Sequence, residues 1–183
     1  MSLDGKTGNC DLEDYPAFRN NPAAVTYNNG EVLACGGYDH TDAHRCWRFD
    51  GSAWSSLPNS NQVHCCADSH NVVTNDGWWV TGRKQTGDGS CNSSWATSEV
   101  YTGTSWIRGP SLPESEFPKY SCVVNLNTTH ALLIGGGYYP GRTDTWLYDL
   151  SSQAWTRTGS LIRGRSYHRC VSLGDLGILV VGG

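Results

Sequence analysis

The chain has 183 residues, of which 22 are glycine and 16% are charged, and its formal net charge is −4. This length suits a single domain, and the glycine content, above the ordinary level of ~7%, indicates many turns. The negative charge argues against a nucleic-acid partner, which would favour a basic stripe. No apolar run approaches the ~18 residues that a membrane span requires.

Three sequence markers recur in the same order about every fifty residues. Each copy has an apolar stretch that ends in a glycine pair, then an aromatic residue, then a Trp followed by a Leu. Self-similarity at this period predicts one supersecondary unit that is stacked repeatedly. The apolar stretches are 31–37, 78–83, 131–137 and 178–183, the aromatic residues are Phe49, Tyr101 and Tyr148, and the Trp and Leu residues are Trp54, Leu57, Trp106, Leu112, Trp155 and Leu161.

Each repeat is expected to form a four-stranded antiparallel sheet, with strands a to d in chain order. Strand a follows the Leu, as in residues 119–127, and strand b is the apolar stretch. Residues 131–134 are continuously apolar, which is typical of a strand buried on both faces, whereas residues 144–150 alternate, as in a half-buried strand. Turn residues at 28–30, 75–77 and 174–177 connect strands a and b. No segment has a sustained helical period, so we expect almost no helix.

The glycine pair and the aromatic residues have separate structural reasons. Strand b is expected to end where neighbouring backbones approach closely, which favours residues that lack a Cβ and can adopt a positive φ. The aromatic residue of strand c and the Trp of strand d are expected to fill the space between neighbouring sheets. The second repeat departs from the pattern, because Gly82 is followed by Arg83 instead of a second glycine.

The ordered markers resemble those of the kelch family of β-propellers over about residues 12–183. The resemblance implies an all-β fold with about three and a half four-stranded blades, forming one domain over residues 1–183. Closed propellers have roughly four to eight blades, so we expect the chain to be part of a larger propeller whose open strand edges favour self-association. The expected repeats are 12–57, 58–112, 113–161 and an incomplete 162–183.

The loops between strands b and c and between strands d and a emerge on one face in this architecture. The b–c loops are 38–45, 83–97 and 138–143, and the d–a loops are 58–63, 113–119 and 162–167. Because exposed Tyr and Arg are preferred anchors of binding, we expect a non-enzymatic module that binds a protein, peptide or glycan, with no cofactor, nucleic acid or membrane partner. The candidate ligand-binding residues are Tyr38, Asp39, His40, Arg45, Arg83, Tyr138, Tyr139, Arg142, Arg163, Arg165, Tyr167 and His168.

A metal-dependent enzyme is the alternative function. Kelch-like propellers include copper radical oxidases, which need two His, two Tyr and a Cys–Tyr cross-link. Tyr167 and His168 are a possible ligand pair near the axis, with Cys170 close behind, and an imidazole site is conceivable there. However, the six His residues are spread over different loops, and no hydrolase triad, paired acids or phosphate-binding loop is recognisable.

The eight cysteines contain no paired CxxC motifs, which argues against a zinc ribbon. Cys35 and Cys46 bracket the first b–c loop on neighbouring antiparallel strands, where opposed residues are close enough for a disulfide. We therefore predict a Cys35–Cys46 bridge. Cys65 or Cys66, Cys122 and Cys170 fall at matching places in strand a, which predicts small, buried, free thiols at Cys122 and Cys170.

The even number of cysteines, the scarcity of Lys and two glycosylation sequons favour a secreted glycoprotein. The sequons begin at Asn92 and Asn127. The first ten residues contain no apolar segment typical of a signal peptide, so a secreted form would be a processed chain or a fragment. A cytoplasmic protein with reduced thiols is the alternative.

Overall fold

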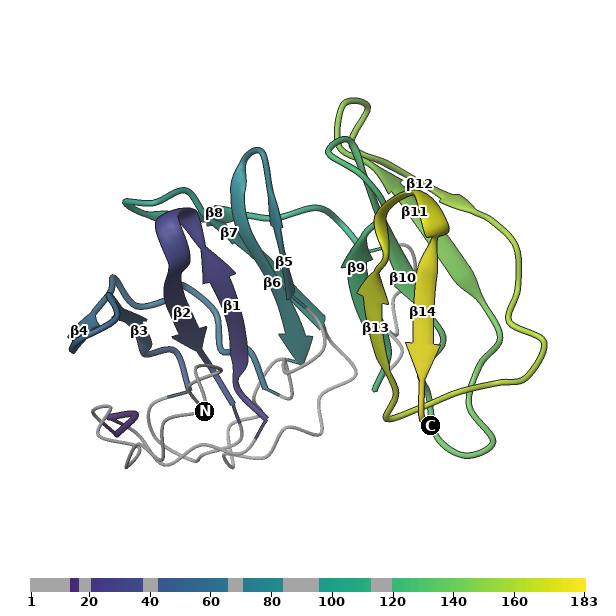
Figure 1. Cartoon of the computed structure of the whole chain (residues 1–183), viewed down its shortest axis with the longest axis horizontal. Helices are drawn as coiled ribbons and strands as arrows, with labels where there is room; N and C mark the ends of the chain where they lie inside the picture. Colours follow the sequence, from purple (N-terminus) through teal and green to yellow (C-terminus); the bar gives the residue numbers. More distant parts are fainter. Residues whose placement is uncertain (1–13, 17–20, 38–42, 66–70, 84–95, 113–119) are drawn as a thin grey trace, which may run out of the picture.

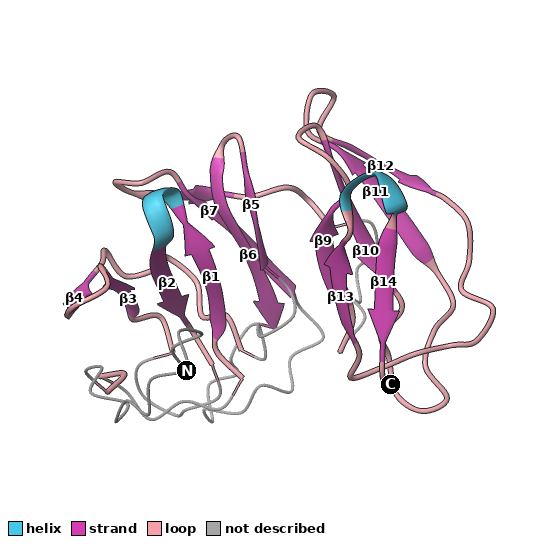
Figure 2. Cartoon of the chain, in the orientation of Figure 1, coloured by secondary structure: helices cyan, strands magenta, loops and turns pink. Residues whose placement is uncertain are grey.

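A computed structural model of the chain describes residues 14–16, 21–37, 43–65, 71–83, 96–112 and 120–183. The described part consists of β-strands, with two short 3-10 turns, η1 (Asn28–Gly30) and η2 (Gly174–Leu176), as its helical elements (Figure 2). The expected all-β fold is therefore confirmed. None of these helical turns is long and apolar enough to cross a membrane.

The strands form four antiparallel sheets in chain order (Figure 1). The first sheet contains β1 (Ala23–Tyr27), β2 (Glu31–Cys35), β3 (Cys46–Phe49) and β4 (Trp54–Ser56). The second contains β5 (Asn71–Thr74), β6 (Gly77–Arg83), β7 (Ala96–Tyr101) and β8 (Trp106–Arg108). The third contains β9 (Cys122–Asn125), β10 (His130–Ile134), β11 (Thr145–Asp149) and β12 (Ala154–Arg157). The fourth is the hairpin of β13 (Arg169–Ser172) and β14 (Ile178–Val181).

The three complete sheets share one register between their third and fourth strands. The aromatic residue of the third strand pairs directly with the Trp of the fourth, as in Tyr101 with Trp106 and Tyr148 with Trp155. The ring centroids of these two pairs are 5.4 Å and 4.9 Å apart. Phe49 and Trp54 form the corresponding pair in the first sheet. The sequence markers therefore identify the strands correctly.

The sheets lie side by side and contact one another through their first strands. β1 contacts β5, β5 contacts β9, and β9 contacts β13, as Figure 1 shows for these four neighbouring strands. Each sheet then continues away from this row through its later strands. This arrangement is blade-like, and it brings the segment that precedes each first strand against the neighbouring sheet.

Two apolar clusters fill the spaces on either side of the second sheet. Trp78 and Trp79 are neighbours on β6, so their side chains point to opposite faces. Trp78 is completely buried in the cluster shared with the first sheet, and Trp79 is 1% exposed in the cluster shared with the third. Trp106 belongs to the first cluster and Trp155 packs against the second, as expected. Trp54 is half-buried against Phe49, outside both clusters.

The glycines at the ends of the second strands allow the expected close approach of backbones. Gly36 has a φ of 71°, and a Cβ at this position would overlap the carbonyl oxygen of His64. Gly135 has a φ of 59°, and a Cβ there would lie 2.8 Å from the carbonyl oxygen of Arg165. Both contacts join a strand end to the segment that precedes the first strand of the next sheet. A side chain at either position would separate the two sheets.

Disulfides confirm one sequence prediction and correct another. Cys35 and Cys46 pair across β2 and β3 with a Cα separation of 4.2 Å and form the predicted bridge. Cys122 and Cys170 were expected to be free thiols, but they form a second disulfide with a Cα separation of 6.0 Å. The reason is that β9 and β13 are adjacent, so equivalent positions of two repeats face each other. Cys65 is also disulfide-bonded.

Candidate binding face

The b–c and d–a loops meet at one end of the sheets. Loop 138–143 lies against loop 162–167, because Arg142 and Arg165 form an isolated β-bridge in which the Arg165 N–H donates to the Arg142 carbonyl at 3.1 Å. Near the first sheet, the Ser60 N–H donates to the His44 carbonyl at 2.9 Å, which joins the corresponding two loops. The β5–β6 and β13–β14 turns lie at the opposite end, at the top of Figure 2.

Three tyrosines from different segments gather at this loop end. The rings of Tyr120 and Tyr167 are stacked, with centroids 3.7 Å apart and an interplanar angle of 19°. The ring of Tyr138 meets Tyr120 edge-on, with centroids 6.1 Å apart. Tyr138 is 66% exposed and Tyr167 is 62% exposed. These three residues, called the tyrosine cluster below, therefore present aromatic surface to solvent.

The backbone holds the stacked pair in an unusual conformation. Tyr120 has a φ of 60° and Tyr167 has a φ of 57°, in the left-handed region that is uncommon for residues other than glycine. The Tyr167 N–H donates to the Tyr120 carbonyl at 3.0 Å. Such conformations persist only where the surrounding structure imposes them, and they gather at functional sites and ligand clamps. The backbone that carries the two rings is therefore constrained by the contacts around it.

The loops that carry Tyr138 and Tyr167 also carry Arg142, Arg163 and Arg165, whose surroundings differ. The Arg142 Nε donates to the Asp144 carboxylate at 2.8 Å, and Arg157 contacts the other oxygen of the same carboxylate. The hydrogen bond from Arg142 holds the pKa of Asp144 below its usual value. Arg163 is exposed, and Arg165 donates through one nitrogen to the Gly182 carbonyl. Tyr139 and Ile162, in the same two loops, are 96% and 100% exposed.

His168 was expected on this face, but its side chain is completely buried behind it. The ring Nε2 lies 3.1 Å from the Ile134 carbonyl oxygen. Burial lowers the pKa of His168, and the nearby charges of Arg165 and Arg169 lower it further against the opposing effect of the Ile134 carbonyl. A positive charge on the ring is therefore disfavoured. His168 belongs to the interior that supports the loop end.

The other predicted residues are distributed as follows. Arg45 is exposed in the first b–c loop, and Asn127 is exposed in the β9–β10 turn. The side chain of Arg83, at the end of β6, lies outside the described residues, as do the whole of Tyr38, Asp39, His40 and Asn92. Sequence reasoning missed Tyr120, which it placed in a first strand. Its position two residues before β9, at the loop end, was the available signal.

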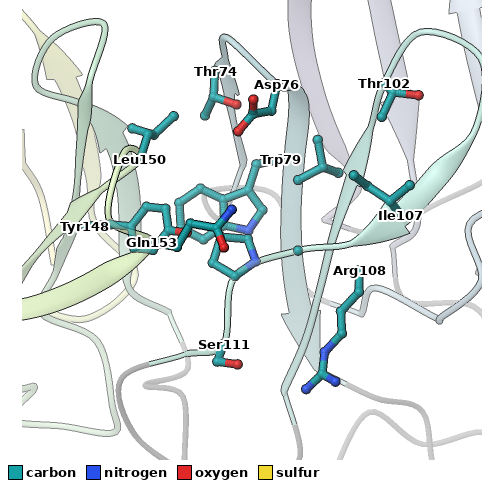
Figure 3. Close-up of a pocket in the computed structure, with 13 residues that line it drawn as sticks. Thr74, Asp76, Trp79, Thr102, Ile107, Arg108, Ser111, Tyr148, Leu150 and Gln153 are labelled. Atoms are coloured by element: carbon teal, nitrogen blue, oxygen red, sulfur yellow. The ribbon is translucent and has the colours of Figure 1, made fainter.

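A separate cleft of about 640 Å³ lies between the second and third sheets. Figure 3 shows Trp79 and Tyr148 at its floor, with Asp76 and Gln153 near them and Arg108 at its edge. Trp79 is 1% exposed and Tyr148 is 4% exposed, so neither ring offers an open face for stacking. Burial raises the pKa of Tyr148, and the charge of Asp76 adds to this effect. The cleft shares no residue with the tyrosine cluster.

The described residues include no group of three His, Cys, Asp or Glu side chains placed to hold a metal ion. No protein-family model matches the chain, and no curated protein matches its sequence. The function is therefore inferred from the geometry of the loop end.

Proposed function

We propose that the chain is a non-enzymatic binding module, built as part of a kelch-type β-propeller, which presents its b–c and d–a loops to a protein, peptide or glycan. The observation that carries this proposal is the exposed tyrosine cluster on a constrained backbone. Tyrosine supplies a large, rigid and amphipathic contact surface and loses little conformational entropy on binding. Arg163, which is exposed in the same loop as Tyr167, adds a second residue type that is enriched at binding hot spots.

The propeller assignment is supported by three features of the described sheets. Three sheets share one strand order and one register, their first strands are neighbours, and glycines end their second strands at close backbone contacts. Propeller blades are four-stranded sheets arranged around a central axis. Since one fold carries many functions, the proposed binding activity depends on the loops and not on the sheets.

Hydrogen bonds between loops organise this surface before any ligand arrives. The Leu161 N–H donates to the Thr143 carbonyl at 2.8 Å, and the Gly136 N–H donates to the Arg165 carbonyl at 2.8 Å. Gly164 packs so closely that a Cβ would overlap the backbone of loop 138–143. Loops that are already ordered lose less entropy on association. Loop 162–167 is therefore suited to recognition without rearrangement.

The test is an unbiased selection of ligands followed by mapping. Phage-displayed peptides and a glycan array would be screened, and the affinity of each hit measured for Tyr167→Ser and Tyr138→Ser. We expect a loss of about tenfold or more in each variant, as for a hot-spot residue. The matched control is Leu176→Ser, since Leu176 is 87% exposed at the opposite end of the sheets. Hits that both tyrosine variants bind normally would contradict the proposed face.

The disulfides indicate an oxidising environment of the extracellular type. We extend this to a secreted glycoprotein. Asn127 is exposed in a turn where its side-chain oxygen accepts a hydrogen bond from the Thr129 N–H at 2.9 Å. Expression in secreting eukaryotic cells, with mass measured before and after glycosidase treatment, tests this extension. An unmodified Asn127 peptide in the secreted protein would count against it.

The residues around Tyr167 do not fit the copper site of a radical oxidase. Such a site needs a cysteine that is cross-linked to a tyrosine, but Cys170 is joined to Cys122. Metal analysis of the purified protein tests the remaining enzyme alternative directly. Stoichiometric copper or iron that is lost in His168→Ala would overturn the binding-module proposal.

A further inference from the structure

The third repeat differs from the second in the turn between its last two strands. In the second repeat the paired residues Tyr101 and Trp106 are five positions apart. The equivalent residues of the third repeat, Tyr148 and Trp155, are seven positions apart. The Tyr101 hydroxyl donates to the Gly103 carbonyl of its own turn at 2.7 Å, whereas no group in the described part of the chain forms a hydrogen bond with the Tyr148 hydroxyl. The longer turn thus accompanies a tyrosine hydroxyl that the described protein does not satisfy.

This hydroxyl belongs to a residue that is otherwise enclosed. Tyr148 is 4% exposed, and its ring centroid lies 5.4 Å from that of Trp79 and 4.9 Å from that of Trp155. Both indole N–H groups are satisfied, because Trp79 donates to the Ser98 hydroxyl at 2.8 Å and Trp155 donates to the Ser111 carbonyl at 2.6 Å. A polar group in a buried position is costly without a partner. A ligand that bonds the Tyr148 hydroxyl therefore supplies a contact that this aromatic cluster lacks.

The hydroxyl faces the cleft between the second and third sheets. Tyr148 and Asp76 line this cleft from its two sides. Burial, followed by the charge of Asp76, raises the pKa of Tyr148, so the hydroxyl stays protonated at neutral pH. Figure 3 shows Tyr148 and Gln153 reaching towards Trp79, with the Asp76 carboxylate turned towards the same space. The cleft volume of about 640 Å³ lies within the range of roughly 300–1,000 Å³ that is usual for small-ligand sites.

Three further side chains supply polar groups of different kinds to the cleft. Asp76 comes from the β5–β6 turn, Arg108 from the end of β8, and Gln153 from the longer turn between β11 and β12. A carboxylate only accepts hydrogen bonds, a guanidinium only donates them, and a carboxamide does both. Within the described ranges, none of these three side chains is held by a hydrogen bond or an ion pair. All three therefore remain able to bind a ligand.

The mixture of charges in the lining favours a neutral ligand. The positive charge of Arg108 opposes a cation, and the negative charge of Asp76 opposes an anion. A hydroxyl group both donates and accepts hydrogen bonds, so a ligand with several hydroxyls matches the carboxylate, the guanidinium and the phenol together. The cleft also offers apolar side chains that can pack against a carbon skeleton, namely Val100, Ile107, Pro110 and Leu150.

We propose that the cleft between the second and third sheets binds a neutral saccharide, with one sugar hydroxyl accepting a hydrogen bond from Tyr148 and donating one to Asp76. Arg108 and Gln153 donate to further hydroxyls of the same sugar. Because the rings of Tyr148 and Trp79 are almost completely buried, hydrogen bonds and not ring stacking orient the ligand. The site lies near the β5–β6 turn, at the end of the sheets opposite the tyrosine cluster.

The test measures the binding of simple neutral saccharides to the intact, oxidised protein. Glucose, galactose, mannose, maltose and lactose are the probes, and each is titrated well beyond a Kd of about 1 mM. Binding is followed by NMR of isotope-labelled protein, through the side-chain NH2 signals of Gln153 and the backbone amide signals of Thr102 and Ser111. We expect saturable shifts of these signals with at least one probe. Absence of such shifts with every probe would overturn the proposal.

Tyr148→Phe and Tyr101→Phe form a matched pair of variants. Tyr148→Phe should weaken saccharide binding about tenfold, the loss expected for one hydrogen bond, and should leave the Tm unchanged. Tyr101→Phe loses the bond to Gly103, so its Tm should fall while its saccharide affinity stays the same. A Phe ring fits this position, since Phe49 holds it in the first repeat. Unchanged affinity in Tyr148→Phe would place the sugar elsewhere and overturn the proposal.

Asp76→Asn tests the acceptor on the facing sheet. This variant should also bind the sugar about tenfold more weakly, because a hydrogen bond to a charged acceptor is stronger than one to a neutral amide. The control is Asp175→Asn, since Asp175 is exposed in the equivalent turn of the fourth sheet and does not line the cleft. Equal affinities in Asp76→Asn and Asp175→Asn would contradict the assigned contact.

Charged sugars separate this proposal from its competitors. Glucosamine and glucuronate carry a sugar ring with a positive and a negative charge, and we expect both to bind more weakly than the best neutral probe. Tighter binding of either would show a site for a charged ligand and would overturn the proposal. A glycan bound by the tyrosine cluster loses affinity in Tyr167→Ser and keeps it in Tyr148→Phe, so the two proposed sites stand or fail separately.

Discussion

The junction between the first and second sheets differs in kind from the junction between the third and fourth. At the former, Trp78 and Trp106 are buried in a shared apolar cluster, and the His64–Glu99 pair lies beside them. At the latter, no residue of β13 or β14 belongs to either apolar cluster, and the Cys122–Cys170 disulfide joins the sheets. The two junctions therefore differ in what joins the sheets: a buried apolar cluster at the first, and a disulfide beside the contact between β9 and β13 at the second.

Trp78→Ala should produce the largest effect, at the junction that depends on burial. Truncating a fully buried Trp costs roughly 3–5 kcal/mol in unfolding free energy, because a cavity remains. Urea denaturation followed by fluorescence measures this loss. Trp54→Ala is the control, since Trp54 lies outside both clusters and should cost less. Equal losses in the two variants would show that the first junction does not depend on its buried cluster.

Removing the Cys122–Cys170 disulfide should produce the next largest effect. The bridge closes a separation of 48 residues, and a loop of this size contributes roughly 2–4 kcal/mol by restricting the unfolded chain. The double variant Cys122→Ser, Cys170→Ser should lose this amount and should also lose protection from hydrogen exchange in β13 and β14. The Cys35–Cys46 bridge spans only 11 residues, so its removal should cost less. A larger loss of stability on removing the Cys35–Cys46 bridge than on removing the Cys122–Cys170 bridge would contradict this prediction.

Glu99→Gln should have a smaller effect, confined to the first junction. The Glu99 carboxylate accepts hydrogen bonds from Asn61 and the Gln62 N–H, both at 2.8 Å, in addition to His64. Glu99→Gln replaces one carboxylate oxygen with an NH2 group, which donates and therefore cannot accept from these donors. A buried polar group left without a partner costs about 1–3 kcal/mol. Chemical denaturation gives the magnitude, and exchange rates at residues 60–65 give the location. A loss seen equally in β13 and β14 would contradict this location.

Lowering the pH should gradually remove the stabilisation that ionised Glu99 gives to the folded protein. Near neutral pH this effect is the smallest of those predicted. Burial raises the pKa of Glu99, but the hydrogen bonds from His64, Asn61 and Gln62 outweigh burial and keep the pKa below the ordinary 4.5. The stabilisation by ionised Glu99 is therefore complete at a pH above the pKa of Glu99 in the unfolded chain. It is lost as the pH falls through the lower pKa of Glu99 in the folded protein. Thermal unfolding of the protein and of Glu99→Gln should converge below about pH 4.5. If the difference in stability between the protein and Glu99→Gln grew as the pH fell, this prediction would be wrong.

The strands were predictable because each repeat carries its own markers. Glycine ends of the second strands, and the Tyr–Trp pairs of the third and fourth, follow from residue type and order. The disulfide between Cys35 and Cys46 was also predictable, since both cysteines flank one loop of one hairpin. These features depend on neighbours that are close along the chain.

Contacts between repeats were not predictable in the same way. Cys122 and Cys170 look like equivalent small residues in sequence, and only the adjacency of β9 and β13 makes them partners. Tyr120 joins the tyrosine cluster for the same reason, through its contact with Tyr167. His168 was placed on the surface because its neighbours are loop residues, yet its ring turns towards Ile134. The spacing of the repeat predicts where the strands lie, whereas packing between repeats determines which side chains are exposed.

The Cys122–Cys170 disulfide also limits the effect of a proteolytic cut between its two cysteines. The two cysteines enclose the third sheet, including the loop 138–143 between β10 and β11, and the loop 162–167 that follows the sheet. Exposed loops are preferred sites of proteolytic cleavage, and Arg163 lies exposed in one of them. A trypsin-like cut there leaves two pieces that remain covalently joined and still packed through β9 and β13. The fragments separate only under reducing conditions, so a nicked molecule retains its sheets in the protease-rich surroundings that oxidised proteins commonly meet.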